Sequence, residues 1–205
     1  TQEIYDLKIK NSVEVLRDLD VDILGLCEVE NRNVLNDLND AFDGKKYKII
    51  HYESPDERGI DNALLYDPKK FKVLFSKPIA NILGKDDKTR DILYVKGIFQ
   101  RSLLHIFVNH WPSNYGGKEK SIPKRNSTSK LLINEIQKIK KAEVEPNIVL
   151  LGDFNENPDD KNVLLLESSG LTNLMMAMID KENISTYIYR GTNYLYDQII
   201  VSNSI

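Results

Sequence analysis

The sequence predicts an α+β domain built mostly from antiparallel β-sheet. Between residues 47 and 110, short runs rich in Val, Ile, Leu, Tyr and Phe follow one another with few helical patterns between them. Strands in direct succession are typical of antiparallel sheet, because neighbouring parallel strands need a long connection, usually a helix. Composition does not shift along the 205 residues, so we expect a single domain over residues 1–205.

In the first half of the chain, apolar residues at helical spacing predict helices over residues 5–19 and 33–42. Ile23-Leu24-Gly25-Leu26-Cys27 is a compact apolar run that ends at Glu28. This pattern is typical of a buried strand with a carboxylate at its end. Further strands are expected over residues 47–52, 60–66, 71–75 and 91–99.

The second half begins with a strand over residues 103–110 that ends on His110. Residues 115–123 contain Gly116-Gly117 and are expected to form a mobile loop before the clearest helix, residues 127–140. A short helix over residues 163–166, a Met-rich apolar segment ending near Ile179 and a segment over 184–190 follow. The last predicted strand covers residues 194–202 and carries an acid near its start.

The most informative stretch is residues 146–158, where the apolar run 148–151 breaks at Gly152. Residues two apart in an extended chain point the same way, so Asp153 and Asn155 are expected to present polar groups side by side at the end of a buried strand. An ordinary exit from a strand into a turn is the alternative, since Gly, Asp and Asn are common turn residues.

Composition narrows the class of protein. The net charge of −3 gives no global basic field for non-specific nucleic-acid binding. No apolar run approaches the roughly 20 residues of a membrane span, and we expect no signal peptide in the first residues. The single cysteine, Cys27, lies in an apolar run and is expected to be buried and unreactive. The sequence assigns no compartment and shows no protein partner.

Several motifs together resemble the endonuclease/exonuclease/phosphatase superfamily, the group related to deoxyribonuclease I. The resemblance covers the chain from Tyr5 to Ser202. It rests on five motifs in this order: Leu26-Cys27-Glu28-Val29-Glu30-Asn31, Arg58-Gly59-Ile60-Asp61-Asn62-Ala63-Leu64-Leu65-Tyr66, Val108-Asn109-His110-Trp111-Pro112-Ser113, Gly152-Asp153-Phe154-Asn155 followed by Pro158, and Asp197-Gln198-Ile199-Ile200-Val201-Ser202.

This resemblance implies a four-layer α/β/β/α sandwich, in which two mostly antiparallel sheets are flanked by helices and the active site lies at one rim. It also implies hydrolysis of phosphate esters with a divalent cation, usually Mg²⁺, with Mn²⁺ as a further possibility. Glu28 matches the metal ligand, since a hard cation prefers carboxylate oxygen.

The resemblance implies catalytic roles for four residues. Asp153 would position or deprotonate the attacking water, and Asn155 would orient that water or hold the phosphate. His110 would hydrogen-bond a phosphoryl oxygen or protonate the leaving oxygen, and Asp197 matches an acid that orients a second histidine. The expected substrate contacts are Arg58, Asn109, Ser113 and Asn114, of which Asn109 could also fix the setting of His110.

Two departures from the family pattern concern the ends of the chain. The family usually opens with a strand ending in Asn and closes with Ser-Asp-His, and neither motif is present. We therefore expect the 205 residues to be an incomplete domain at both ends, which would bind metal weakly and hydrolyse slowly if at all.

A metal-dependent phosphodiesterase acting on nucleic acid is the favoured function. A local basic patch of Lys118, Lys120, Lys124 and Arg125 favours it modestly. Trp111 and Tyr115 could stack on a base or a sugar, or pack in the core. The alternatives are a phosphatase or phospholipase-like hydrolase of small or lipid phosphoesters, and a binding module that has lost its chemistry.

Overall fold

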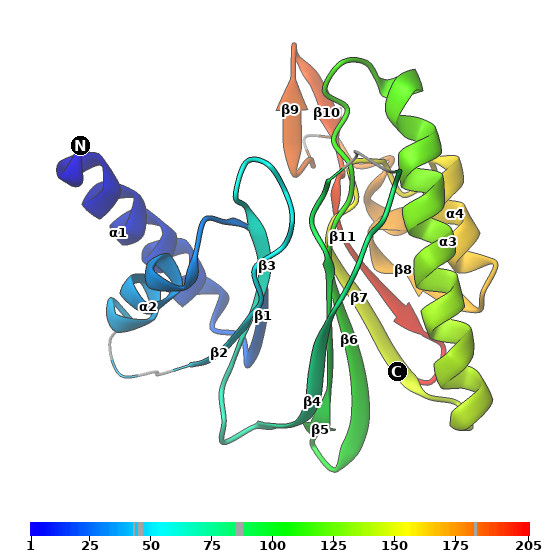
Figure 1. Cartoon of the computed structure of the whole chain (residues 1–205), viewed down its shortest axis with the longest axis horizontal. Helices are drawn as coiled ribbons and strands as arrows, with labels where there is room; N and C mark the ends of the chain where they lie inside the picture. The colour runs from blue at the N-terminus through cyan, green and yellow to red at the C-terminus, as the bar shows by residue number, and fades with distance from the viewer. Residues whose placement is uncertain (43, 45–46, 85–87, 183) are drawn as a thin grey trace.

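The structure is a computed structural model that describes residues 1–42, 44, 47–84, 88–182 and 184–205. Two β-sheets face each other, and helices cover the outer face of each sheet (Figure 1). The helices are α1 (Gln2–Leu19), α2 (Arg32–Asp40), α3 (Lys118–Ala142), α4 (Lys161–Glu167) and the 3₁₀ helix η1 (Leu174–Met178). The strands are β1 (Ile23–Val29), β2 (Lys48–His51), β3 (Asp61–Tyr66), β4 (Phe71–Ile79), β5 (Ile92–Phe99), β6 (Ser102–His110), β7 (Asn147–Asp153), β8 (Leu171–Asn173), β9 (Tyr187–Tyr189), β10 (Thr192–Tyr194) and β11 (Asp197–Ser202).

The strands form a small sheet in the order β1-β3-β2, a six-stranded sheet in the order β4-β5-β6-β7-β11-β8, and the separate hairpin β9-β10. All pairs are antiparallel except β6 with β7. The parallel pair is joined by α3, as a crossover between parallel strands requires. The predicted α+β class with mostly antiparallel sheets is confirmed.

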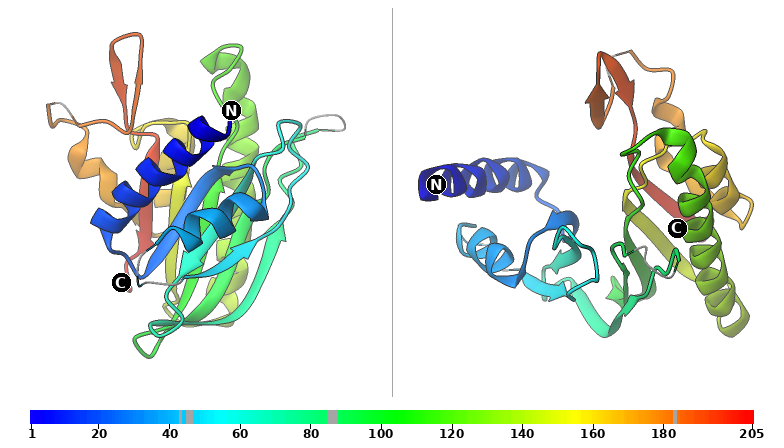
Figure 2. Two further views of the ribbon diagram at one scale, coloured as in Figure 1. Left: turned by 90° about the vertical axis from the view of Figure 1, so that its left-hand side faces the viewer. Right: turned by 45° about the horizontal axis from the view of Figure 1, so that its top comes forward.

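Three apolar clusters define the layers. Residues such as Val13, Leu35 and Leu65 pack α1 and α2 against the outer face of the three-stranded sheet. A second cluster, with Leu132 and Ile136 of α3, covers the six-stranded sheet from the other side. The third lies between the sheets and is rich in side chains of β5 and β6. The expected four-layer α/β/β/α sandwich is therefore confirmed (Figure 2).

The two sheets approach closely beside the rim where the predicted site residues lie. A Cβ on Gly25 of β1 would overlap the Leu151 side chain of β7. Glycine at this position lets the three-stranded sheet lie against β7 without displacing it. None of the helices in the described ranges is long and apolar enough to cross a membrane.

The predicted mobile loop over residues 115–123 is wrong in its second half. Residues from Lys118 onward form the first turns of α3, and Pro123 lies inside the helix. Arg125 stabilises this start, because its guanidinium donates to the Lys118 carbonyl at 3.4 Å and to the Ser121 hydroxyl at 2.7 Å. These contacts within α3 offset the hydrogen bond that proline cannot donate.

The predicted strand over residues 194–202 is divided in two. Tyr194 ends β10, whereas β11 begins at Asp197. Between them, Leu195 N donates to Asn157 Oδ1 at 2.9 Å and Phe154 N donates to Tyr196 O at 2.8 Å. The backbone groups of Leu195 and Tyr196 are therefore bonded to the loop after β7, and this separates β10 from β11.

Candidate active site

Three of the predicted site residues form a row across the six-stranded sheet. His110 of β6 and Asp197 of β11 are both register partners of Asp153 of β7. Register partners on adjacent strands point to the same face of a sheet. Val108 and Leu151, two residues earlier on β6 and β7, pack between the two sheets. The row therefore lies at the end where β6 and β7 finish, and it faces the three-stranded sheet.

Glu28 reaches this rim from the three-stranded sheet. The pairing of β1 with β3 shifts between Leu26 and Val29, and Glu28 within this bulge has a φ of 59°. Its side chain is 64% exposed, with Oε1 4.0 Å from Arg58 Nη1. After burial, which has the largest effect, the charge of Glu28 also contributes to the raised pKa values of Asp153 and Asp197. The bulge thus re-aims the carboxylate toward the other sheet.

Gly152 allows β7 to reach the rim in this position. Its φ is +124°, and a Cβ would overlap the carbonyl oxygen of Asn109. Asn109 itself is completely buried, and its Nδ2 donates to the Phe107 carbonyl at 3.0 Å. The structure corrects the predicted substrate contact at Asn109, because a buried amide bonded to the backbone of its own strand is shielded from any substrate.

Asp153 and Asn155 do not lie side by side as an extended chain would place them. Asn155 has a φ of 49°, so the chain turns at the end of β7. Its backbone N–H donates to Asp153 Oδ1 at 2.8 Å, and its Nδ2 donates to the Trp111 carbonyl at 3.0 Å. Asn155 is 8% exposed. The backbone N–H of Asn155 therefore holds one oxygen of the Asp153 carboxylate in place at this turn.

The loop after β6 holds the two remaining predicted substrate contacts. Asn114 Nδ2 donates to the Asn155 carbonyl at 2.9 Å and to Tyr196 Oη at 3.1 Å. Its buried Oδ1 has no hydrogen-bond partner among the described residues. Ser113 Oγ accepts from Tyr115 N at 3.3 Å. Asn114 thus ties this loop to the loop that carries Asn155.

A buried arginine that sequence reasoning missed also belongs to the rim. Arg90 Nη2 donates to the Trp111 carbonyl at 2.5 Å, and Nη1 donates to Asp56 Oδ2 at 3.2 Å. Asp56 also lies 3.4 Å from Arg58 Nε. Arg90 lies in a polar loop without a periodic pattern, so no sequence signal would have identified it.

Burial and neighbouring charges shift the pKa values of the row. Burial, and then the charge of Asp197, raise the pKa of Asp153 to about 6 against the opposing N–H of Asn155. Burial also raises the pKa of Asp197. For His110, burial, Arg90 and Arg58 lower the pKa to about 3. The imidazole is therefore neutral at pH 7, and its Nε2 lies 3.7 Å from Asp153 Oδ2.

The acids at the rim form an open set of oxygen donors. Mg²⁺ commonly binds through one or two carboxylates and keeps several waters, so it does not require a closed cage. The raised pKa values of Asp153 and Asp197 show that their negative charges are poorly compensated. A divalent cation would relieve this repulsion. Glu28, Asp153 and Asp197 therefore supply the donor chemistry that a hard divalent cation prefers.

A tighter acidic cluster lies further back in the loop that carries Arg58. Within the described ranges, the ligand atoms of His51, Glu53 and Asp61 lie within 4.8 Å of one another. Asp61 is already bonded through both oxygens, to His51 Nε2 at 2.9 Å and to Ser54 Oγ at 2.7 Å. These bonds fix the start of the loop that presents Arg58, and so give this cluster a structural explanation.

Burial determines which of the other predicted contacts can reach a substrate. Trp111 is completely buried against Phe154, so it packs in the core and cannot stack on a substrate. Tyr115 is 95% exposed. The predicted basic patch is smaller than expected, because Arg125 is buried against Glu156 at 2.7 Å and Lys118 pairs with Asp160 at 2.9 Å.

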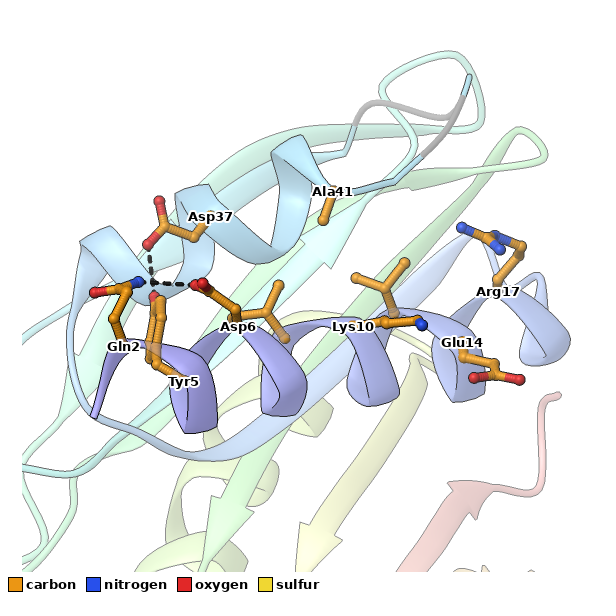
Figure 3. A pocket seen from close by; sticks show the side chains of 10 residues that line it. Gln2, Tyr5, Asp6, Lys10, Glu14, Arg17, Asp37 and Ala41 are labelled. Atoms are coloured by element: carbon orange, nitrogen blue, oxygen red, sulfur yellow. Dashed lines mark hydrogen bonds between the residues drawn. The ribbon is translucent and has the colours of Figure 1, made fainter.

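A polar groove lies elsewhere on the molecule, between α1 and α2 on the outer side of the three-stranded sheet (Figure 3). Tyr5 and Asp37 face each other across it, with Tyr5 Oη donating to Asp37 Oδ2 at 2.6 Å. No rim residue lines this groove. We assign no role to it.

Two packed sheets with carboxylates, a neutral imidazole and two arginines at one rim have the groups that hydrolysis of a phosphate ester uses. The chain belongs to the Endonuclease/Exonuclease/phosphatase family, whose family model matches residues 1–205. This match confirms the resemblance predicted from the motifs. It supports phosphoester hydrolysis as the general kind of activity.

Solved structures with the same fold have low sequence identity to this chain. TDP2 of D. rerio, in a complex with single strand DNA product, is 16% identical with a TM-score of 0.71, covering 96% of this chain and 78% of that chain. The human Nocturnin catalytic domain is 19% identical with a TM-score of 0.69, covering 96% and 75%. A mannosyl-6-phosphatase of Bacteroides thetaiotaomicron is 18% identical with a TM-score of 0.72, covering 98% and 78%. A comparison with curated protein sequences found no match.

Proposed function

We propose that this protein is a divalent-metal-dependent phosphodiesterase that cleaves nucleic acid. The observation that carries the proposal is the row of His110, Asp153 and Asp197 on three adjacent strands, with Glu28 facing it from the other sheet. Carboxylates for a cation and a water lie here beside hydrogen-bond donors for a phosphate. Hydrolysis of a phosphate diester needs both.

Asp153 is the proposed general base. Its pKa of about 6 leaves it ionised at neutral pH but more basic than an ordinary aspartate, as proton abstraction from water requires. The bond from Asn155 N holds one of its oxygens in place. Asp197, its register partner, adds negative charge that keeps Asp153 basic.

His110 and Arg58 are the proposed contacts to the phosphoryl oxygens. A histidine with a pKa of about 3 is neutral, so it donates one N–H and does not carry a proton for the leaving group. Of the two predicted roles for His110, the hydrogen bond to a phosphoryl oxygen is therefore the one proposed. Arg58 is 53% exposed at the rim and can place its guanidinium on a phosphate.

Glu28 would hold the cation, with Mg²⁺ or Mn²⁺ as the proposed ion. When bound, such an ion neutralises negative charge that develops on the phosphate. The carboxylates also set the metal preference, because an all-oxygen donor set favours hard cations over soft ones.

A phosphatase or lipid phosphoesterase is the second candidate. It is favoured by the small basic surface near the rim, since Arg125 is buried and Lys118 is paired with Asp160. Enzymes that follow a nucleic-acid backbone usually place several free cations along it. The fold of a mannosyl-6-phosphatase is also similar to this one.

Parallel assays of the purified chain distinguish these candidates. Plasmid nicking, bis(p-nitrophenyl) phosphate and p-nitrophenyl phosphate report nuclease, diesterase and monoesterase activity, each with Mg²⁺, Mn²⁺ or EDTA. We expect metal-dependent nicking that falls by at least about a hundredfold in Asp153→Asn and Glu28→Gln. Glu30→Gln, an exposed acid two residues from Glu28, is the matched control and should keep full activity.

Turnover of the monoester without plasmid nicking would support the phosphatase in place of the phosphodiesterase. If no substrate is cleaved while Mg²⁺ still raises the Tm of the wild type and not of Glu28→Gln, the chain is a metal-binding module without catalysis. Equal activity in Asp153→Asn and the wild type would show that the rim is not the active site.

A further inference from the structure

A hairpin of tyrosines stands at the rim, beside the row of site residues (Figures 1 and 2). It consists of β9 and β10, which pair through Thr192 with Tyr189 and Tyr194 with Tyr187. The turn between them has φ values of 49° at Arg190 and 79° at Gly191. Two central residues at positive φ are typical of the tight two-residue hairpin turn. We call residues 187–196, which add Leu195 and Tyr196 to this hairpin, the tyrosine hairpin.

Four tyrosines of this hairpin form one continuous aromatic array. Tyr187 lies 6.4 Å from Tyr189 with ring planes 9° apart, and 5.4 Å from Tyr196 with planes 19° apart, measured between ring centroids. Tyr194 lies 4.9 Å from Tyr196. The array therefore extends from the base of the hairpin to its tip, with the rings near Tyr187 nearly parallel.

The array begins at the candidate active site. Tyr196, which is 6% exposed, accepts a hydrogen bond at 3.1 Å from Asn114 Nδ2, and the same amide donates to the Asn155 carbonyl. Thr186, the residue before the hairpin, is bonded to the row, because Asp197 N donates to Thr186 Oγ1 at 3.0 Å. Thr186 N in turn donates to the Tyr194 carbonyl at 2.9 Å.

The aromatic rings become accessible toward the tip. Tyr187 and Tyr189 are 46% and 49% exposed, whereas Tyr196 at the base is buried. The Arg190 guanidinium lies 5.2 Å from the centre of the Tyr189 ring, and residues 187–196 include no acid. Half-exposed aromatic faces with a cation among them suit a planar ligand that carries negative charge.

We propose that the tyrosine hairpin is a stacking platform for the unpaired bases of a single-stranded nucleic acid whose phosphate lies in the rim site. This inference rests on the proposed function and adds the substrate class. Bases stack on aromatic side chains whatever their sequence, because every base has a π-face. In a duplex those faces are covered by neighbouring base pairs, so the platform selects single strands.

A lipid surface is the less suitable ligand. Of the side chains on the hairpin, Ile188 is the exposed aliphatic one at 66%, whereas the others near the tip are tyrosines, Arg190, Thr192 and Asn193. Insertion into a bilayer would bury the polar groups of this tip without partners.

Binding measured in EDTA tests the platform without hydrolysis. The probes are a fluorescein-labelled decathymidylate and a labelled duplex of the same length, followed by anisotropy. We expect the wild type to prefer the single strand, and the double variant Tyr187→Ala/Tyr189→Ala to weaken its Kd by about tenfold to a hundredfold. Tyr187→Phe/Tyr189→Phe should keep the affinity within about twofold, because stacking needs the ring and not the hydroxyl.

Ile188→Ala is the matched control, since it removes an exposed apolar side chain from the other face of the same strand. It should bind the single strand as the wild type does. Circular dichroism and the Tm of each variant report whether the fold is retained. If the alanine double variant binds as tightly as the wild type, or if duplex binds as tightly as single strand, the platform is excluded.

A second readout separates this inference from the proposed function. In the alanine double variant, kcat/KM for the oligonucleotide should fall relative to kcat/KM for bis(p-nitrophenyl) phosphate, which presents a phosphate without a strand, and the fall should come from a higher KM for the oligonucleotide. Tyrosine-dependent binding of the single strand with no hydrolysis of any ester supports the platform and rejects the proposed function. Tyrosine-dependent binding to phosphatidylcholine/phosphatidylserine vesicles, with none to the oligonucleotide, overturns the platform.

Discussion

Burial shifts the two central residues of the rim in opposite directions. The charged form of Asp153 is an anion and that of His110 is a cation, and burial disfavours both charges. The pKa of Asp153 therefore rises to about 6 and that of His110 falls to about 3. Because the imidazole is neutral at pH 7 and its Nε2 lies 3.7 Å from Asp153 Oδ2, the two groups are not an ion pair and remain separate acid–base functions.

The first prediction concerns the pH dependence of Asp153. In the metal-free protein the carboxyl of Asp153 should titrate with a midpoint near pH 6, because burial and then the charge of Asp197 disfavour its ionised form. NMR of the ¹³C-labelled carboxyl in EDTA measures this midpoint, and added Mg²⁺ should move it to lower pH. An ordinary aspartate titrates near pH 4, and such a midpoint without metal would contradict the effect of burial on Asp153.

The same shift makes a prediction for stability. The folded-state pKa of Asp153, about 6, lies above the usual value of 3.8 for an aspartate, so the folded state binds the proton more tightly than the unfolded chain. Stability is then lost as the pH rises from about 4 to about 6, by at most about 3 kcal/mol. Asp153→Asn should raise the Tm relative to wild type at pH 7 more than at pH 4, whereas Asp159→Asn, an exposed control, should not.

At the scale of elements, the rim depends on how β7 ends. The strand passes Asn109 at Gly152, turns at Asn155 and is then held by Arg125 of α3 through Glu156. Glu156 Oε1 also accepts from Asn162 Nδ2 at 2.7 Å. The loop after β7 is therefore bonded to α3 and to α4 just beyond the site, which keeps Asp153 in one position.

Gly152→Ala tests this element. The new Cβ would overlap the Asn109 carbonyl at a φ of +124°, so we expect a loss of about 3 kcal/mol or more in the free energy of unfolding. Gly116→Ala is the control, since it has a φ of +82° with nothing within 4 Å and should cost only about 1–2 kcal/mol. Urea unfolding measures both. Equal losses in the two variants would show that the close approach of β7 to Asn109 is unimportant.

At the scale of the whole molecule, the site exists only because two sheets are packed together. Glu28 belongs to the three-stranded sheet, whereas His110, Asp153 and Asp197 belong to the six-stranded sheet. The apolar layer between the sheets sets the distance from Glu28 to Asp153. The outer layer under α3 stabilises the fold but does not lie between the two halves of the site.

Two truncations with similar expected losses of stability test these two layers separately, Ile106→Ala and Ile136→Ala. Ile106 lies between the sheets, and Ile136 lies under α3. Each should cost about 2–5 kcal/mol, because both side chains are almost completely buried. At a temperature where both variants are folded, Ile106→Ala should lower kcat/KM for the diester at least about tenfold, and Ile136→Ala by less than about twofold. A similar effect on kcat/KM in both would contradict the proposed role of the inner layer.

Local patterns along the chain predict most of the strands and the residues at their ends. Apolar runs and the breakers Gly, Asp and Pro act over a few neighbouring residues, so β1, β6 and β7 were predicted with Glu28, His110 and Asp153 at their ends. The order of the motifs also indicated the family and its four layers, which the family match and the fold confirm.

Packing of the sheets and helices determines which polar groups share the rim and which lie in the core. Arg90 joins the site, whereas Asn109 and Trp111 are buried, and the four tyrosines near Asp197 form one array. These outcomes depend on contacts between residues far apart in the chain. Neither periodicity nor turn propensity contains such contacts, because burial and pairing are set when the sheets and helices pack together.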